Sequence, residues 1–326
     1  MRRLQLGLAM VALPVFALSL FVAGCGKDEK KSESDDVGDV KKDDKSAKTE
    51  LKVMEPKGGV LKGKITVKSM PDVAADTKVI ETGIAELKDQ SQKDVCLMGS
   101  ETEKTGQHFR VGDNKNLGNV FVWVKPDTGY FFKVDDKQLK EAKEKKVFLD
   151  QPHCAFIPHC AILFSEYHPD HKNPKKAERT GQTFEIHNSA PISHNTNYTG
   201  GGRNPSGNPI IPAGTNLDEA KVGHFKPQAS EPVTFKCNIH GWMDAYLWVL
   251  DTPYYAISLS DTLDKANKVE KSDEKFGTYE IKNLPVGKVR VFAWHERGNW
   301  LTSNKGDVVE IKEGEPFVKD FEMEVK

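Results

Sequence analysis

The chain carries almost no net charge and no long basic segment. Its 326 residues include 47 Lys and Arg against 48 Asp and Glu, which leaves a formal net charge of −1. Because no basic run with interleaved aromatic residues is present, the composition gives no sign of a nucleic-acid partner. Cysteine is scarce as well, with five residues in the whole chain. Each cysteine therefore has to be accounted for separately.

The N-terminus lacks an apolar run long enough for a membrane span. Arg2 and Arg3 precede a mostly apolar stretch over residues 6–22, which is too short and wrongly flanked to cross a bilayer. It ends in Val22-Ala23-Gly24-Cys25, which resembles the lipobox of bacterial lipoproteins. The resemblance implies a signal peptide over residues 1–24, cleavage before Cys25 and a lipid on Cys25. The alternative is an ordinary secretory signal with an incidental Cys, and either one predicts an exported chain.

Residues 25–57 are expected to be a disordered, charged linker. The segment 26–50 carries seven Lys and nine Asp or Glu but no aromatic residue, so it buries too little apolar surface to offset its chain entropy. Such a linker extends by self-repulsion and would hold the folded part away from the bilayer. Gly26 rather than Asp follows the Cys. By resemblance to a bacterial sorting rule, this favours the outer membrane and a periplasm-facing protein.

Three soft or borderline metal ligands fall within seven residues, namely Cys237, His240 and Met243. Residues 233–237 before them alternate apolar and polar, and residues 245–250 after them are almost all apolar. Both patterns predict strands, so the ligands are expected on a tight loop between two core strands. A thiolate with a thioether favours copper, and two His with one Cys and a weak axial Met form a blue-copper site.

The second His is expected from a distant segment. Residues 183–188 alternate like a strand and lead through Asn188-Ser189-Ala190-Pro191-Ile192-Ser193 to His194 and Asn195. The two blocks, N-x-x-P-x-x-H-N and C-x-x-H-x-x-M, resemble the cupredoxins of the plastocyanin and amicyanin group. The resemblance implies one type 1 copper, with His194, Cys237 and His240 as trigonal ligands and Met243 as axial ligand. It also implies that Asn195 ties the two ligand loops together by hydrogen bonds.

Three alternative interpretations of the Cys loop have less support. Cys237 and His240 could be core residues, because free Cys is often buried. They could be half of a zinc site, but Met is a poor zinc ligand and no second Cys/His pair has the usual spacing. A cysteine nucleophile would need an adjacent base and an oxyanion hole, for which the sequence gives no indication.

The predicted function is one-electron transfer to an unidentified redox protein, such as a cytochrome or a dehydrogenase. The alternative is a copper storage or delivery protein. An oxidase or nitrite reductase is disfavoured, because the chain lacks the clustered H-x-H motifs that multicopper enzymes need and the C-x-x-x-C of a binuclear copper centre. By family resemblance, the His240 edge is expected to be the part of the site closest to solvent. Ile239 and Trp242 would then form an apolar docking patch around it, unless they are core residues.

The fold is expected to be all-β, a cupredoxin-like Greek-key sandwich with a second, smaller β-sandwich. Residues 60–67 and 120–124 are the clearest early strands, the second being fully apolar and therefore central. A short exposed helix is predicted within 135–146, before a return to strand at 147–149. The cupredoxin-like domain, with an N-terminal extension, is placed at residues 58–250.

Residues 251–326 are expected to form the smaller sandwich. A strand, an L-P-x-G turn at 284–287 and a second strand follow one another there, which resembles the carboxypeptidase-regulatory-like or transthyretin-like family. That family implies no catalytic residue. The early strand at 59–67 could complete this sandwich, and the pattern leaves the choice open.

Three cysteines remain, Cys96, Cys154 and Cys160. In an exported protein one disulfide and one leftover thiol are favoured over a Cys2His2 cluster with His153 and His159, because a strand would put the His on the opposite face. Residues 150–159 resemble the strand that opens the cupredoxin part of large exported cupredoxin-like proteins, including methylamine-utilisation proteins. The resemblance implies a Cys96–Cys154 disulfide and an extra Cys160.

Overall fold

The protein is described here from a computed structural model, which covers residues 50–202 and 204–325. The predicted signal peptide, the lipidation of Cys25 and most of the linker lie outside these residues. Among the helices of the described ranges, none has the length and apolar character needed to cross a membrane.

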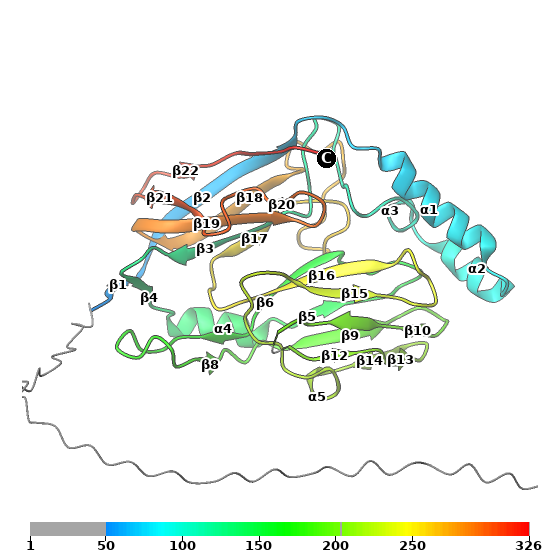
Figure 1. The fold of residues 1–326 in the computed structure, drawn as a ribbon, viewed down its shortest axis with the longest axis horizontal. Helices are drawn as coiled ribbons and strands as arrows, with labels where there is room; N and C mark the ends of the chain where they lie inside the picture. The colour runs from blue at the N-terminus through cyan, green and yellow to red at the C-terminus, as the bar shows by residue number, and fades with distance from the viewer. Residues whose placement is uncertain (1–49, 203, 326) are drawn as a thin grey trace, which may run out of the picture. The chain divides into compact units, whose positions relative to one another are not determined.

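One β-sandwich carries the predicted ligand loops (Figure 1). Its larger sheet has the strand order β12-β11-β15-β16-β6, and a smaller sheet has the order β14-β9-β5. A buried core with Leu149, Phe184, Phe235 and Leu247 lies between them. The larger sheet contains β6 (Cys160–Phe164), β11 (Asn197–Thr199), β12 (Ser206–Gly207), β15 (Val233–Lys236) and β16 (Asp244–Leu250). The smaller sheet contains β5 (Val147–Leu149), β9 (Phe184–Asn188) and β14 (Thr215–Leu217), and a separate pair is formed by β10 (His194–Asn195) and β13 (Ile210–Ile211).

A second β-sandwich combines early and late strands of the chain. One sheet joins β17-β3-β19-β20, with β21 beside β19, and the other joins β18-β2-β22, with β23 beside β2. Their strands are β2 (Pro56–Val67), β3 (Phe121–Pro126), β17 (Tyr255–Ile257), β18 (Thr278–Pro285), β19 (Gly287–His295), β20 (Asn299–Trp300), β21 (Asp307–Ile311), β22 (Phe317–Val318) and β23 (Phe321–Met323). Two short pairs, β1 (Lys52–Met54) with β4 (Tyr130–Phe132) and β7 (Glu166–Tyr167) with β8 (Glu178–Arg179), complete the strands.

The two sandwiches pack against each other through strands that are buried on both faces. On β3, Val122 and Val124 face the core of the second sandwich, whereas Phe121 and Trp123 face an aromatic cluster with Trp248 of β16. The Trp123 and Trp248 ring centroids are 4.5 Å apart. Burial on both faces explains why both strands are continuously apolar rather than alternating.

The all-β prediction is confirmed, but the expected boundary at residue 250 does not separate the sheets. Strands β2 and β3 precede this boundary in the chain, yet they pair with β18 and β19 from beyond it. The sequence pattern had left open whether residues 59–67 complete the later sandwich, and the pairing of β2 shows that they do. The apolar run of β3 predicts that the strand is buried, but it does not indicate which strand pairs with it. A domain boundary at residue 250 is therefore wrong for β2 and β3.

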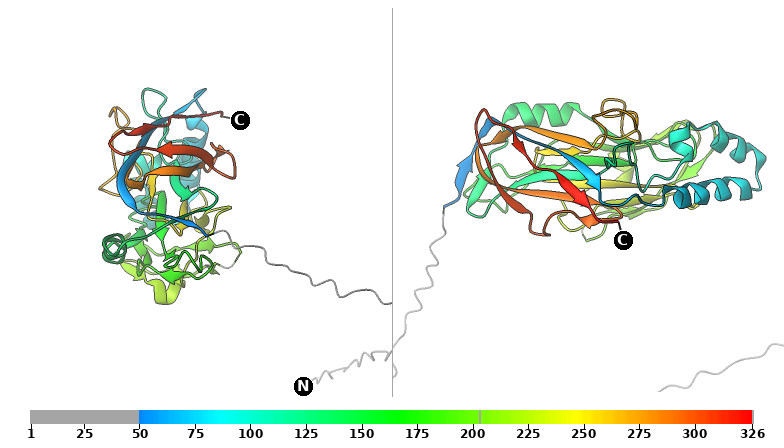
Figure 2. Two further views of the ribbon diagram at one scale, coloured as in Figure 1. Left: turned by 90° about the vertical axis from the view of Figure 1, so that its left-hand side faces the viewer. Right: turned by 90° about the horizontal axis from the view of Figure 1, so that it is seen from above.

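Two helices within residues 73–98 project at one end of the structure, and most of the helices were not expected (Figure 2). The predicted helix is present as α4 (Asp136–Glu144). The unpredicted ones are α1 (Val73–Glu86), α2 (Gln90–Met98), α3 (Glu101–Lys104) and α5 (Glu219–Val222). Side chains of Asp72, Asp89 and Ser100 cap the first three, and Ser100 with Glu103 forms a capping box. These caps are the sequence signal that could have found the helices.

Two segments differ from the expected local structure. Residues 151–159 are irregular rather than a strand, and β6 begins only at Cys160. Residues 204–226 are rich in Gly, Pro and Asn, a composition that favours loops, yet they contain three short strands and α5. Of these, β13 pairs with β10, the strand that carries His194.

Candidate metal centre

The Cys loop is a compact turn closed by its own backbone. Cys237 directly follows β15 and Met243 directly precedes β16. The backbone amide of Cys237 donates to the carbonyl of Met243 at 3.2 Å. The Met243 amide donates to the His240 carbonyl at 2.9 Å. The His240 amide points at the Cys237 sulfur, 3.4 Å away. The hydrogen bonds within the loop and the two core strands at its ends therefore fix the positions of Cys237, His240 and Met243 relative to one another.

The second loop is held by a buried asparagine. Asn188 is the last residue of β9, and its side-chain Nδ2 donates to the backbone carbonyls of Ile192 at 2.9 Å and Ile211 at 2.8 Å. His194 pairs with Ile211 across β10 and β13. These bonds place His194, which is fully buried, over the Cys loop. The Asn188 contacts were not anticipated, although Asn188 belongs to the motif that predicted His194.

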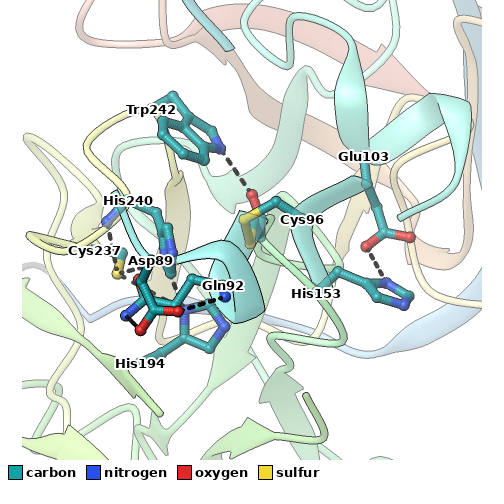
Figure 3. Close-up of a disulfide and its surroundings, with 10 residues drawn as sticks. Asp89, Gln92, Cys96, Glu103, His153, His194, Cys237, His240 and Trp242 are labelled. Carbon is teal, nitrogen blue, oxygen red and sulfur yellow. Dashed lines mark hydrogen bonds and ion pairs between the residues drawn. A yellow bond between two sulfur atoms is a disulfide. The ribbon is translucent and has the colours of Figure 1, made fainter. Parts of the chain in front are cut away.

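Three of the predicted ligands converge on one point (Figure 3). The Cys237 sulfur lies 3.9 Å from His194 Nδ1 and 3.8 Å from His240 Nδ1. The two Nδ1 atoms are 3.1 Å apart. All three side chains are buried.

The spacing of the three donors suits a first-row metal ion. With metal–nitrogen and metal–sulfur bonds of about 2.0 and 2.3 Å, a trigonal arrangement separates nitrogen from sulfur by about 3.7 Å. The shorter nitrogen–nitrogen separation corresponds to an angle of about 100° at such an ion. Met243, predicted as the fourth ligand, is buried in the same core as Cys237. The residues present therefore fit a metal with one thiolate, two imidazoles and a nearby thioether.

Asn195 joins the two ligand loops. Its Oδ1 accepts hydrogen bonds from the amides of Asn238 at 2.8 Å and Ile239 at 3.1 Å. The Cys237 sulfur is 3.4 Å from the same oxygen. These are the contacts that the family resemblance implied for this residue. They hold the His194 segment and the Cys loop at a fixed distance.

Burial keeps both imidazoles neutral in the metal-free protein. It lowers the pKa of His194 to about 3, with a further contribution from the neighbouring His240, and it lowers the pKa of His240 to about 4. Burial also raises the pKa of the Cys237 thiol. At neutral pH the nitrogens are therefore ready to bind a metal, whereas the thiol has to release its proton when a metal arrives.

His240 was predicted to be the ligand closest to solvent, and this prediction is wrong. Its side chain is fully buried, although the neighbouring Ile239 is 42% exposed. The covering groups come from the unpredicted helices and the disulfide. The Trp242 ring centroid lies 5.4 Å from that of His240, and a Cβ added at Gly83 of α1 would collide with the Trp242 ring.

The Cys96–Cys154 disulfide is confirmed and forms part of this cover. Its sulfurs lie within 4.8 Å of a ring nitrogen of His240. Trp242 Nε1 donates to the Cys154 carbonyl at 3.0 Å, which joins the Cys loop to the disulfide (Figure 3). We call α1, α2 and this disulfide the cap. Its position over His240 could not be derived from the sequence, since no pattern marks which surface a helix covers.

The remaining candidates do not join the centre. Cys160 is a free, buried thiol, as the resemblance implied, and burial raises its pKa well above the usual range. His153 pairs with Glu103 at 2.8 Å and His159 with Glu296 at 2.6 Å. The disfavoured Cys2His2 cluster is therefore not assembled in the described residues.

Comparisons with known proteins give only distant similarities. No family model and no curated protein matches the chain. A Cu-containing nitrite reductase from Thermus scotoductus is 14% identical over 33% of this chain and 23% of its own length, with a TM-score of 0.25. A purple cupredoxin from Nitrosopumilus maritimus is 10% identical over 32% of this chain and 99% of its own, with a TM-score of 0.22. A mutant of amicyanin in its reduced state is 11% identical over 39% of this chain and 99% of its own, with a TM-score of 0.24. At these TM-scores none of the three decides the function, and the carboxypeptidase-regulatory-like resemblance of residues 251–326 stays a prediction.

Proposed function

We propose that the protein binds one type 1 copper and carries single electrons between redox proteins. The observation that carries this proposal is the buried triangle of Cys237 Sγ, His194 Nδ1 and His240 Nδ1 beside Met243. A thiolate and a thioether select copper over harder ions, and two imidazoles with one thiolate are the equatorial set of a blue-copper site. Copper would supply a one-electron redox couple at this position.

The chain's own contribution is a rigid ligand frame. Asn195 and the Cys237–Met243 backbone bond hold the ligand loops by contacts that do not involve the metal. The His240 amide directed at the Cys237 sulfur stabilises the thiolate form. A frame that stays in place through oxidation and reduction keeps the rearrangement on electron transfer small.

Addition of Cu(II) to the purified protein is expected to produce intense visible absorption from thiolate-to-copper charge transfer. Cys237→Ser should abolish this absorption and His194→Ala should weaken it strongly, because these changes remove the thiolate and one equatorial nitrogen. Cys160→Ser is the matched control, since Cys160 is a buried thiol away from the centre, and it should leave the spectrum unchanged. Visible and EPR spectra make the measurement. A colourless protein that takes zinc in preference to copper would refute the proposal.

The cap favours a second candidate, a copper storage or delivery protein. Complete burial of His240 beneath Trp242 and α1 lengthens the path by which an electron would reach a partner. The same cover would slow the loss of a bound ion. Fast, reversible electron exchange by the wild-type protein would select the carrier, whereas slow exchange with strong copper retention would select storage.

Gly83→Ala is expected to loosen the cap and to speed both electron exchange and copper loss. The added methyl group collides with the Trp242 ring, and overpacking of this kind typically costs about 1–3 kcal/mol. Thr82→Ala is the control, because it is an exposed change to alanine in the same helix. Stopped-flow reduction and transfer of copper to a chelator are the measurements. Equal rates in Gly83→Ala and wild type would show that the cap does not limit access.

Export and membrane attachment are also proposed. The lipobox-like Val22-Ala23-Gly24-Cys25 supports a lipid on Cys25, and the charged linker supports a folded part held off the periplasmic face of a membrane. The partner would be a redox protein such as a cytochrome or a dehydrogenase. Labelling with a fatty acid should mark the wild type and not Cys25→Ala, and a labelled Cys25→Ala would exclude this attachment site.

A further inference from the structure

A second group of metal-binding side chains lies beside the Cys loop. Asp244 is the first residue of β16. One potential ligand atom from each of Asp244, His108 and Glu296 lies within 4.8 Å of those of the other two. His108 Nε2 is 2.8 Å from Asp244 Oδ2 and 3.9 Å from Glu296 Oε2. His159 joins them, because its Nε2 is 2.6 Å from Glu296 Oε1. Two imidazoles and two carboxylates thus converge from four separate segments of the chain.

The outer nitrogens of both imidazoles face oxygen atoms. His159 Nδ1 is 3.1 Å from the Asp244 carbonyl, and His108 Nδ1 is 3.3 Å from Asp76 Oδ2. Metal-binding histidines are oriented in this way, with the outer N–H given to a carbonyl or a carboxylate while the inner nitrogen faces the ion. Arg297 Nη2 also reaches His108 Nδ1, at 2.6 Å, and lies 4.0 Å from Asp76 Oδ1. Because a guanidinium only donates, His108 Nδ1 accepts in this contact, and it can donate to Asp76 only after Arg297 moves away from it.

Two carboxylate oxygens in this group have no hydrogen-bond partner among the described residues. They are Glu296 Oε2 and Asp244 Oδ1, and both atoms are buried. The Glu296 side chain is 2% exposed, and its unpartnered oxygen points toward His108. A buried carboxylate oxygen without a donor is costly, so such atoms call for a cation or a bound water.

We propose that His108, His159, Asp244 and Glu296 bind a divalent first-row transition-metal ion. The donor set contains only imidazole nitrogen and carboxylate oxygen, which suits ions such as Mn(II), Fe(II), Co(II) and Zn(II) and lacks the soft sulfur of the Cys loop. A cavity of about 380 Å³, lined in part by His108, Asp244 and Glu296, adjoins the group. It provides an entry path for the ion and room for a solvent ligand.

The second site is a neighbour of the first but does not depend on it. Asp244 follows Met243 directly, and the cavity is also lined by Gly241 and Trp242 of the Cys loop. The two sites share no side chain. Loss of the thiolate ligand therefore leaves the second site intact, and the two proposals can fail separately.

Co(II) binding to the full mature chain tests the site. In Cys237→Ser the Co(II) spectrum of the second site should show ligand-field bands without thiolate charge transfer, at one ion per chain. Adding His108→Asn and Glu296→Gln in that background should weaken Co(II) binding by about 100-fold or more, since loss of an orienting residue alone costs about 10–100-fold. Adding His171→Asn is the matched control, because His171 lies beside the exposed Asp170, and it should leave binding unchanged.

The copper site supplies the check on folding. In the wild-type background, His108→Asn with Glu296→Gln should retain the visible copper spectrum if the fold is intact, and urea unfolding reports stability where copper does not bind. Cys237→Ser that binds no Co(II) would overturn the second site. Equal Co(II) affinity with and without His108→Asn and Glu296→Gln would overturn it as well, whatever the outcome of the copper experiment.

Discussion

Removal of the Cys96–Cys154 disulfide is expected to lower the free energy of unfolding of the metal-free protein by about 4 kcal/mol. The two cysteines are 58 residues apart, and the loop-entropy model gives about this value for a cross-link that closes such a loop. The native state loses contacts too, because the disulfide anchors α2 against the segment that accepts the Trp242 hydrogen bond. Urea unfolding of Cys96→Ser/Cys154→Ser measures the difference.

A dithiol reductant provides the matched control for this prediction. It should destabilise the metal-free wild type by a similar amount and should leave Cys96→Ser/Cys154→Ser unchanged, because Cys160 and Cys237 are already free thiols. A loss below about 1 kcal/mol would mean that the cap is held by its other contacts and that the disulfide adds little. Faster reaction of the Cys237 thiol with an alkylating reagent in the variant would show that the cap has also opened.

Local patterns predicted the ligand loops because their geometry is set within short segments. Alternation at 233–237 and 183–188 identified β15 and β9, and the spacing from Cys237 to His240 follows from a single tight turn. The contacts of Asn195 could be predicted because it adjoins His194 in a motif whose family resemblance implies hydrogen bonds to the Cys loop. In these cases the positions of the side chains depend on one or two neighbouring strands.

Long-range packing was beyond the reach of the same patterns. The apolar run of β3 predicted burial, but nothing in it indicates that Trp123 meets Trp248 while Val122 meets the other sandwich. His240 packs against Trp242, which in turn packs against Gly83 of α1, more than 150 residues earlier in the chain. The sequence pattern therefore predicted the ligands and missed what covers them.

The second group of ligands was missed for a related reason. His159 and Glu296 are each flanked by another potential metal ligand, Cys160 and His295, so spacing along the chain does not single them out. The side chains of the adjacent residues His295 and Glu296 have different surroundings in the structure. His295 is fully buried with Nε2 unpartnered, whereas Glu296 turns toward His108 and His159. Residues from four segments meet only once both sandwiches are formed.

Acid is expected to destabilise the metal-free protein strongly between pH 6.5 and about 4. In the unfolded chain His194 and His240 take up protons near pH 6.5. In the folded protein burial lowers the pKa of His194 to about 3 and that of His240 to about 4. These two histidines bind protons in the unfolded state but not in the folded state throughout this range, so the stability that they contribute is fully present above pH 6.5 and is lost as the pH decreases. At about 1.4 kcal/mol per pKa unit, His194 alone accounts for a loss of the order of 5 kcal/mol by pH 3.

The measurement is urea unfolding of the metal-free protein at a series of pH values, compared with His194→Asn. The variant should show a shallower decrease between pH 6.5 and 4, because one of the groups that protonates only on unfolding is gone. Some dependence should remain, since burial lowers the pKa of His240 and holds that of His295 at about 3 as well. Equal slopes for wild type and His194→Asn would mean that His194 accepts a proton in the folded state. Its nitrogen would then not be kept neutral by burial, and a metal would have to compete with protons for it even at mildly acidic pH.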